Sequence, residues 1–541
     1  MTKRKLLVTS ALPYANGSIH IGHLVEYIQT DIWARFQKLI GNDCVYICAD
    51  DTHGTPIMLN AQKQGKTPEE FIKMFHEEHQ DDFKRFHVKF DYFGSTNSDE
   101  NRILSENIYK SAKAAGAIYE KEIEQLYDDK KGMFLPDRFV QGTCPKCDAK
   151  EQYGDSCEVC SATYSPMDLK EPKSVVSGEV PVKKKSSHHF FKLSQFEDTV
   201  KDWLSKNVVR PEVRNKLNEW FETGLRDWDI SRDEPYFGFK IPGTTDKYFY
   251  VWLDAPVGYI ACTQNWAKDK SVTHDDIWKG DDWEIHHFIG KDILYFHTLF
   301  WPAMLSVGGY KQPEKVNIHG FLTVNGEKMS KSRGTFILAK DFGEKVNPEF
   351  LRYFYAAKLN GGLDDLDLNL DDFLVKINSD VLGKFINIGS RLGSILHKKL
   401  DGQLSSLSED GEALLTEIRA KADDIKTAYE TLDFNKAMRL IMGCADLANK
   451  YIDAKAPWAM VKVDPDAAKQ VCTDGLNAFR LLAIYLQPVL PEISEKIKEY
   501  LCSPDFTWES INDTLSYQSV NPYEHLAGRL QKEDLDTIVQ S

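Results

Sequence analysis

The chain lacks any apolar run long enough to span a lipid bilayer, and it lacks a short apolar segment near its N-terminus of the kind that directs secretion. It also has no excess of basic residues. Its 82 Asp and Glu against 67 Lys and Arg give a net charge of −15, which argues against indiscriminate binding to nucleic acid. We therefore expect a cytoplasmic protein without a membrane partner. A nucleic-acid partner would have to contact local basic strips, such as 183–185 or 328–333.

Cysteine is sparse outside one cluster. Six of the ten cysteines are scattered among apolar residues and are expected to pack as small hydrophobic side chains. The other four form two Cys-x-x-Cys pairs, Cys144 with Cys147 and Cys157 with Cys160. Two such pairs facing each other supply four thiolates, which suit tetrahedral zinc, whereas disulfides fit poorly with a chain that has no secretion signal. Because protein fills all four positions, the spacing predicts one structural Zn2+.

A first short signature, His20-Ile21-Gly22-His23, lies where a strand pattern gives way to a helix pattern. Residues 5–11 form a β-prone apolar run, and the apolar residues after the signature recur at helical spacing. A helix N-terminus offers free backbone N–H groups to an anion, and Gly22 lets a ligand approach the backbone closely. His20 and His23 can donate hydrogen bonds to phosphate oxygens. Two surface histidines at a helix cap are an equal alternative for this motif alone.

A second signature, Lys328-Met329-Ser330-Lys331-Ser332, follows a strand pattern over 316–324 and an Asn-Gly hairpin signal at 325–326. Its cations and hydroxyls, beside a glycine, can close over a polyphosphate and neutralise charge as pyrophosphate leaves. A solvated lysine loop is the alternative. The presence of the first signature, in the matching order, favours the phosphate role.

The strand and helix patterns predict an α/β protein of several domains, because 541 residues exceed a single core. The opening strand, helix and strand indicate a Rossmann-like parallel sheet. This pattern is interrupted by an insertion that carries the four cysteines. Strand patterns resume at 248–253, 285–290 and 316–324, and the rest is almost wholly helical. The fold class is therefore a Rossmann-like catalytic domain with a zinc-bearing insertion, followed by an all-α C-terminal bundle.

Longer motifs extend over nearly the whole chain. They are 11–20, 48–51 with 53–56, 132–138, 228–232, 248–256, 288–292 and 456–458. On these stretches the chain resembles the class I aminoacyl-tRNA synthetases, and among them the bacterial-type methionyl-tRNA synthetases. The resemblance implies that the carboxylate of L-methionine attacks the α-phosphate of ATP, which enters with Mg2+, to give methionyl-adenylate and pyrophosphate. The methionyl group then passes to the 3′ end of tRNA(Met), initiator and elongator.

The resemblance also assigns roles to the segments of the chain. Residues 1–115 and 241–325 correspond to the two halves of the Rossmann catalytic domain, and 116–240 to a connective insertion with the zinc knuckles. Residues 326–385 hold the signature loop and a stem-contact region, and 386–541 form a helical anticodon-binding domain. The insertion is too short for the large hydrolytic editing domain of related enzymes. Because the chain ends without a C-terminal OB-fold, we expect a monomer.

Asp51 follows the second predicted strand, at the edge where open α/β sheets bind ligands. A carboxylate there can anchor an α-ammonium group, although an N-cap for the next helix is an alternative. The resemblance completes a methionine site with Ala11, Leu12, Tyr14, Arg232, Trp252, Ala255, Pro256, Tyr259, Ile293 and His297. Aromatic walls favour a thioether, but without the resemblance such a set would be more typical of a core.

The resemblance assigns catalysis to His20, His23, Lys328 and Lys331, with Lys331 as the main mobile cation. Gly22 and Lys291 join these residues in ATP binding.

For the anticodon, the resemblance indicates Asn387, Arg391, Pro457 and Trp458, where Trp458 stacks on unpaired bases. Packing at a helix end is the alternative for Trp458. Gly383 departs from the Asn of well-known relatives, which puts any contact there in doubt. Two rival functions remain: a cysteine-specific synthetase, and a non-catalytic zinc-ribbon RNA-binding protein.

Overall fold

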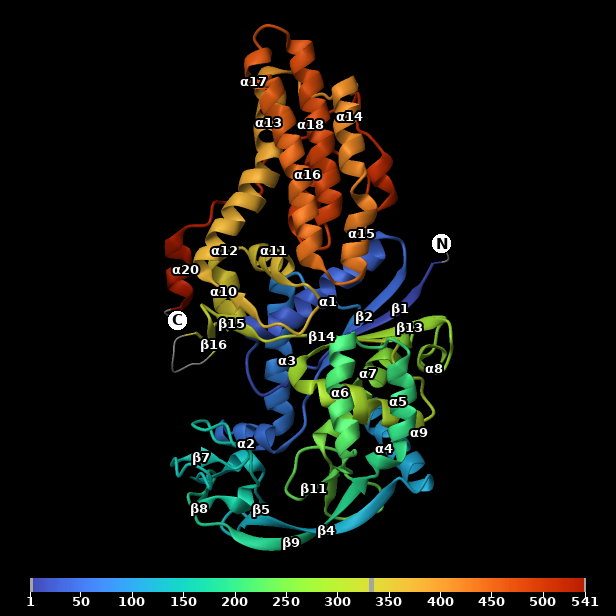
Figure 1. Cartoon of the computed structure of the whole chain (residues 1–541), viewed down its shortest axis with the longest axis vertical. Coiled ribbons are helices and arrows are strands. Elements are labelled where there is room, and N and C mark those ends of the chain that lie inside the picture. The colour runs from blue at the N-terminus through green and yellow to red at the C-terminus, as the bar shows by residue number, and fades with distance from the viewer. Residues whose placement is uncertain (1–2, 330–334, 540–541) are drawn as a thin grey trace.

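The computed structural model describes residues 3–329 and 335–539. The molecule is elongated, with three regions along its longest axis (Figure 1). A helical bundle forms one end, a parallel sheet with its helices occupies the middle, and an antiparallel region lies at the other end.

The central sheet has five parallel strands in the order β14-β13-β1-β2-β3. Their bounds are β1 Lys5–Ser10, β2 Asp43–Asp50, β3 Tyr92–Ser95, β13 Trp283–Gly290 and β14 Lys315–His319. β1 lies between β2 and β13, so the direction of the crossovers reverses here. Ligands of open α/β sheets bind at such a point, beyond the carboxyl ends of the strands.

The helices around the sheet follow the apolar patterns of the sequence. They are α1 Ile21–Leu39, α2 Thr55–Lys63, α3 Pro68–Arg85, α4 Asp99–Ala114, α7 Val251–Ala267, α8 His274–Trp278 and α9 Trp301–Val307. The expected apolar face of α1 is buried, with Leu24, Ile28 and Ile32 inside the core. Hydrophobic burial of this stripe therefore fixes the helix that carries the first signature.

The insertion between β3 and β13 is built on a long antiparallel pair, β4 Ile118–Asp128 and β9 Val182–Phe191, edged by β5 Met133–Phe134 and β10 Trp228–Asp229. A second small sheet joins β6 Val140–Thr143, β7 Gln152–Tyr153 and β8 Lys170–Ser174. Helices α5 Glu197–Ser205 and α6 Pro211–Thr223 follow, and β11 Ser231–Asp233 pairs with β12 Lys247–Phe249.

The basic strip at 183–185 is partly neutralised by neighbouring acids. Lys184 Nζ lies 2.7 Å from an Asp129 carboxylate oxygen, and Lys185 Nζ lies 2.8 Å from Glu122.

After the sheet, β15 Leu322–Val324 pairs with β16 Glu327–Lys328 and β17 Leu366–Leu368. The Asn-Gly prediction is confirmed, because Asn325 and Gly326 form the turn between β15 and β16 with φ of 51° and 79°. Helices α10 Ala339–Lys345 and α11 Pro348–Lys358 then lead to the bundle.

The C-terminal region is helical, as predicted. It comprises α12 Leu370–Lys376, a π-helical segment Ile377–Ile386, α13 Asn387–Lys399, α14 Glu409–Arg419, α15 Ala422–Glu430, α16 Phe434–Lys455, α17 Pro457–Met460, α18 Pro465–Leu486, α19 Pro491–Tyr500 and α20 Lys532–Val539. Helix α18 is buried along most of its length. Within 3–329 and 335–539, we find no helix with the length and apolar character needed to cross a membrane.

Two predicted strands differ from the structure. The run 248–253 is not one strand, because β12 stops at Phe249 and α7 begins at Val251. The run 316–324 is two strands in different sheets, separated at Gly320. A Cβ on Gly320 would lie 2.1 Å from the Asp364 carbonyl oxygen, so only glycine permits the close approach at which the chain leaves the main sheet.

Candidate active site

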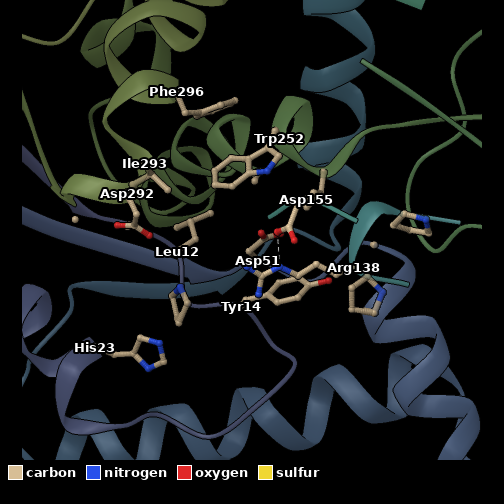
Figure 2. Close-up of a pocket in the computed structure, with 18 of the residues that line it drawn as sticks. Leu12, Tyr14, His23, Asp51, Arg138, Asp155, Trp252, Asp292, Ile293 and Phe296 are labelled. Atoms are coloured by element: carbon tan, nitrogen blue, oxygen red, sulfur yellow. Dashed lines mark hydrogen bonds and ion pairs between the residues drawn. The ribbon is translucent and has the colours of Figure 1, made fainter. Parts of the chain in front are cut away.

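A cavity of about 1030 Å3 opens at the carboxyl ends of β1, β2 and β13. It gathers residues that are far apart in the chain. Those predicted above that line it are Ala11, Leu12, Tyr14, His20, Gly22, His23, Asp51, Arg232, Trp252, Ala255, Pro256, Tyr259, Ile293, His297 and Lys328. Figure 2 shows Trp252, Ile293 and Phe296 toward one end of this cavity and His23 toward the opposite end. Lys331 lies outside the described residues.

The first signature forms a reciprocal cap at the start of α1. His20 Nδ1 accepts hydrogen bonds from the backbone N–H groups of Gly22 and His23, at 3.1 and 3.3 Å. His23 Nδ1 in turn accepts the backbone N–H of His20 at 3.3 Å. Burial lowers the pKa of His20 to about 4 and holds the pKa of His23 well below its usual value. Both rings are therefore neutral at pH 7, and because Nδ1 is an acceptor, each carries its proton on Nε2 as a donor.

The structure brings the two signature regions together. A Cβ added to Gly22 would lie 2.8 Å from the terminal methyl group of Met329 and 3.0 Å from the His20 ring, so the second signature approaches α1 closely at this glycine. C-terminal to the second signature, the Ile337 carbonyl accepts the backbone N–H of Ile21 at 3.0 Å. The ring of His20 also lies 5.1 Å from that of Phe336.

The predicted phosphate-binding cations, Lys328 and Lys291, differ in their surroundings. Lys328 is exposed on β16 and lines the cavity. Lys291 follows β13, but its Nζ lies 2.6 Å from an Asp365 carboxylate oxygen and 4.7 Å above the Phe321 ring. Lys291 is not among the residues that line the cavity.

Asp51 lies deep in the cavity, directly after β2. The backbone of Tyr14 pairs with it, since the Asp51 N–H donates to Pro13 and the Ala15 N–H donates to Asp51. Its Oδ1 is buried and has no hydrogen-bond partner within the described chain. Burial, together with the nearby Asp254 carboxylate, raises the pKa of Asp51 well above its ordinary value. A buried carboxylate oxygen without a partner is suited to a cationic ligand.

Arg232 borders the same cavity and is held on two sides. Its guanidinium stacks 3.6 Å above the Tyr250 ring, and one nitrogen lies 3.3 Å from Asp229. His188 bridges Asp229 and Asp233 through its two ring nitrogens, at 2.8 and 2.9 Å. These bonds outweigh desolvation and raise the pKa of His188, so a charged network fixes the strand segment that carries Arg232.

The apolar end of the cavity has a polar pair behind it. Trp252 packs against Phe296 with ring centroids 4.6 Å apart. The Tyr259 hydroxyl lies 3.0 Å from His297 Nε2, and His297 Nδ1 lies 3.2 Å from the Ile293 carbonyl. Burial lowers the pKa of His297 to about 4, so the ring is neutral and its single proton is directed to that carbonyl. The Tyr259 hydroxyl therefore donates its proton to His297, and its oxygen can still accept a hydrogen bond.

The cavity also contains residues that the sequence reasoning missed. These include Glu26, Arg138, Asp155, Asp292, Phe296 and His319. Asp292 and His319 lie at the carboxyl ends of β13 and β14, so the strand-end rule that found Asp51 could have found them. Glu26 could not have been found in this way. It lies on the buried face of α1, and the helical pattern of the sequence does not distinguish a cavity-lining residue from a core residue there.

The four clustered cysteines converge as predicted. Their sulfur atoms all lie within 4.8 Å of one another, with Cys144 to Cys160 at 3.8 Å and Cys147 to Cys157 at 3.6 Å. Four sulfurs bound tetrahedrally at about 2.3 Å from zinc would lie about 3.8 Å apart, so the donor set fits this metal. Backbone N–H groups of Lys146 and Cys160 donate to two of the sulfurs, which favours thiolates.

The predicted RNA-reading residues lie on the helical bundle, away from the cavity. Helix α17 lies at the far end of the bundle from the sheet (Figure 1). Trp458 is 43% exposed, and the Arg391 guanidinium stacks 4.6 Å from its ring centroid while bonding Asp453 at 2.7 Å. Pro457 starts α17 after Ala456, which has a left-handed backbone. Asn387 begins α13, one turn before Arg391.

The parallel sheet with its strand-end cavity and the attached helical bundle define an α/β protein with a ligand-sized cavity at the strand ends. Comparison with protein families identifies two matching regions. Residues 6–393 match the family model of tRNA synthetases class I (M), and 403–524 match the anticodon binding domain of methionyl tRNA ligase. The chain therefore belongs to the methionyl-tRNA synthetase family of class I.

Similar curated proteins carry the same assignment. Methionine–tRNA ligase of Bdellovibrio bacteriovorus is 52% identical over 539 residues, which is 99% of this chain and 78% of that protein. Methionine–tRNA ligase of Thiobacillus denitrificans is 54% identical over 542 residues, with the same coverage. Among solved structures, Mycobacterium tuberculosis methionyl-tRNA synthetase in complex with methionyl-adenylate has the same fold. Its TM-score is 0.79 at 24% identity, covering 96% of this chain and 99% of that chain.

Proposed function

We propose that this chain is a methionine–tRNA ligase, which activates methionine with ATP and transfers it to tRNA(Met). Its membership of the family supports this activity directly. Within the structure, one observation carries the proposal. The same cavity holds the buried, unpartnered Asp51 carboxylate oxygen, an aromatic wall at Trp252, and the signature histidines at the start of α1.

In this proposal, different residues have separate roles in adenylate formation. Asp51 binds the α-ammonium of methionine, and the wall of Trp252 and Phe296 contacts its thioether. His20 and His23 donate from Nε2 to phosphate oxygens at the N-terminus of α1. Lys328 and Lys331 neutralise the pyrophosphate as it leaves, with Lys331 as the main cation. No covalent enzyme nucleophile is needed, because positioning and charge neutralisation lower the barrier.

Two metal ions belong to this proposal in different ways. Cys144, Cys147, Cys157 and Cys160 would hold one Zn2+, and because protein fills all four positions this ion supports structure. Mg2+ enters with ATP and supplies charge neutralisation to its phosphates. Lys291 is a further phosphate ligand in this proposal, provided that it leaves Asp365. The monomeric state and the cytoplasmic location stay predictions.

Amino-acid-dependent ATP–pyrophosphate exchange tests this function. We expect exchange with methionine and with no other member of a panel of amino acids that includes cysteine. Exchange with cysteine alone would assign the chain to a different specificity. Absence of exchange with every amino acid, from protein shown to be folded, would favour a binding protein that uses the bundle without the catalytic site.

A further inference from the structure

His79 of α3 connects the end of β2 to the turn that leads into the first signature. Its Nδ1 lies 2.6 Å from Asp50 Oδ1, and its Nε2 lies 2.9 Å from the Gly17 carbonyl oxygen. The side chains of His79 and Asp50 are both fully buried. A carboxylate and a carbonyl can only accept, so both ring nitrogens of His79 must donate. Only the positively charged imidazolium has two N–H donors.

The acidic groups around His79 favour this charge. Asp50 on β2 faces it, and Glu78 and Asp82 lie near it on α3. His23 faces it from α1 and does not favour the charge. His76, also on α3, bonds the other oxygen of Asp50 at 2.6 Å. Desolvation acts to lower the pKa of His79, but the hydrogen bond and charge of Asp50 and the Gly17 carbonyl outweigh it and raise this pKa. The charge of His79 in turn contributes to the lowered pKa of His23.

We propose that His79 is a positioning residue for adenylate formation, acting as a buried imidazolium that fixes the signature turn and places a positive charge behind the phosphate end of α1. This inference rests on the proposed function. His20 and His23 are neutral donors, so α1 itself supplies only partial charges there. A buried charge is screened by solvent much less than an exposed lysine is. His79 is not among the residues that line the cavity, so it acts through the turn and its field.

Two substitutions remove the charge of His79 and differ in which of its two hydrogen bonds they keep. In His79→Asn the amide nitrogen takes the place of Nδ1, which keeps the bond to Asp50 and loses the bond to Gly17. In His79→Gln the amide nitrogen reaches the place of Nε2, which keeps the bond to Gly17; both variants lose the charge. His76→Gln is the matched control, because His76 shares Asp50 on the same helix but is 27% exposed and is not bonded to the turn.

Methionine-dependent ATP–pyrophosphate exchange gives the first readout. We expect both variants to lose about tenfold or more in kcat/KM for ATP, the size of one charged hydrogen bond, while the KM for methionine stays within about twofold. The imidazolium is present below its raised pKa and lost above it, so wild-type kcat/KM for ATP should fall as pH rises through that pKa. This fall of kcat/KM with rising pH should be absent from both His79 variants and retained in His76→Gln. Equal losses for ATP and methionine, or an unchanged pH profile, would overturn the proposal.

Nitrogen NMR of 15N-labelled histidines gives a readout that does not depend on variants being active. In the wild-type protein at about pH 7.5 we expect the His79 ring, like the His188 ring between Asp229 and Asp233, to have both nitrogens protonated. The His79 signal should be kept in His76→Gln and lost in His79→Asn. If the variants do not fold, the wild-type spectrum decides once its histidine signals are assigned to single residues: a His79 ring with only one protonated nitrogen would overturn the proposal. Failure of the proposed function differs, because it would abolish exchange in the wild-type protein while leaving this spectrum unchanged.

Discussion

At the scale of single residues, Asp51 gives the protein a pH-dependent affinity for its amino acid. Burial raises its pKa, so as pH falls the empty site takes up a proton before an exposed carboxyl would. Only the ionised form binds an ammonium group, so the KM for methionine should rise as pH falls through this raised pKa. Asp51→Asn should raise the KM by roughly 10- to 150-fold, corresponding to about 1.5–3 kcal/mol, and remove this pH dependence.

The measurement is methionine KM by pyrophosphate exchange between about pH 5.5 and 8. Asp155→Asn is the control, because Asp155 also lines the cavity but is paired with Arg138 at 2.8 Å. The methionine KM of Asp155→Asn should still rise as pH falls, as it does in the wild-type protein. An acid limb that persists in Asp51→Asn would assign the titration to another group.

Single residues also show what could be predicted from sequence. Asp51 was predicted because it directly follows an apolar strand, and the cavity holds it there. Phe296 was not predicted, because an aromatic residue in an apolar helical stretch has the same pattern whether it faces a cavity or a core. His79 was missed for a similar reason: its role comes from Asp50 and Gly17, which are distant in sequence and meet only in the folded chain.

At the scale of elements, α17 presents Trp458 beside Arg391 at the end of the bundle. Stacking of a base on an exposed aromatic contributes about 1–3 kcal/mol, so Trp458→Ala should raise the KM for tRNA by roughly 5- to 150-fold. Adenylate formation should be unchanged, since α17 lies away from the cavity.

Aminoacylation and pyrophosphate exchange measured on one preparation separate these effects. Tyr517→Ala, at a 77% exposed aromatic, is the control. Loss of both activities would make Trp458 a packing residue.

The small sheet β6-β7-β8 should depend on its metal. Its local apolar core contains few buried side chains, among them Val140 and Leu169. Such a core contributes little stability, so binding of the ion supplies much of the folding free energy. Metal analysis should give about one zinc per chain, and a chelator should remove hydrogen-exchange protection from 140–174 before the central sheet. Cys147→Ser should reproduce the loss, whereas Cys502→Ser, at another exposed cysteine, should not. Protection unchanged after complete metal removal would contradict this.

The limits of prediction at this scale come from tertiary contacts. The start of α1 was predicted well, because turn residues and then a helical apolar stripe mark it. The end of β12 was not predicted correctly. The apolar run 248–253 suits a strand and the helix that begins at Val251 equally well. Helix α7 even continues through Pro256, which a sequence rule would place at a helix boundary.

At the scale of the whole molecule, a buried arginine joins the first signature helix to the bundle. Arg352 of α11 is fully buried and donates to Asp31 of α1 at 2.7 Å. It also donates to the carbonyls of Pro488 and Val489, after α18, at 2.8 and 2.9 Å. Desolvation opposes the charge of Asp31, but Arg35 and Arg352 outweigh it and lower the pKa of Asp31. This contact was not predictable, because its three segments are far apart in the sequence.

Arg352→Met should therefore destabilise the protein by about 3–5 kcal/mol, because it leaves buried acceptors without a partner. The lowered pKa of Asp31 contributes stability above its unfolded value, and this is lost as pH falls through the folded value. The variant's deficit in thermal unfolding midpoint should thus stay large from about pH 7 down to about pH 4 and shrink only below that pH. Lys455→Met, which breaks the exposed pair with Asp410, should shift the midpoint little. A small, pH-independent shift for Arg352→Met would mean that packing alone joins α1 to the end of α18.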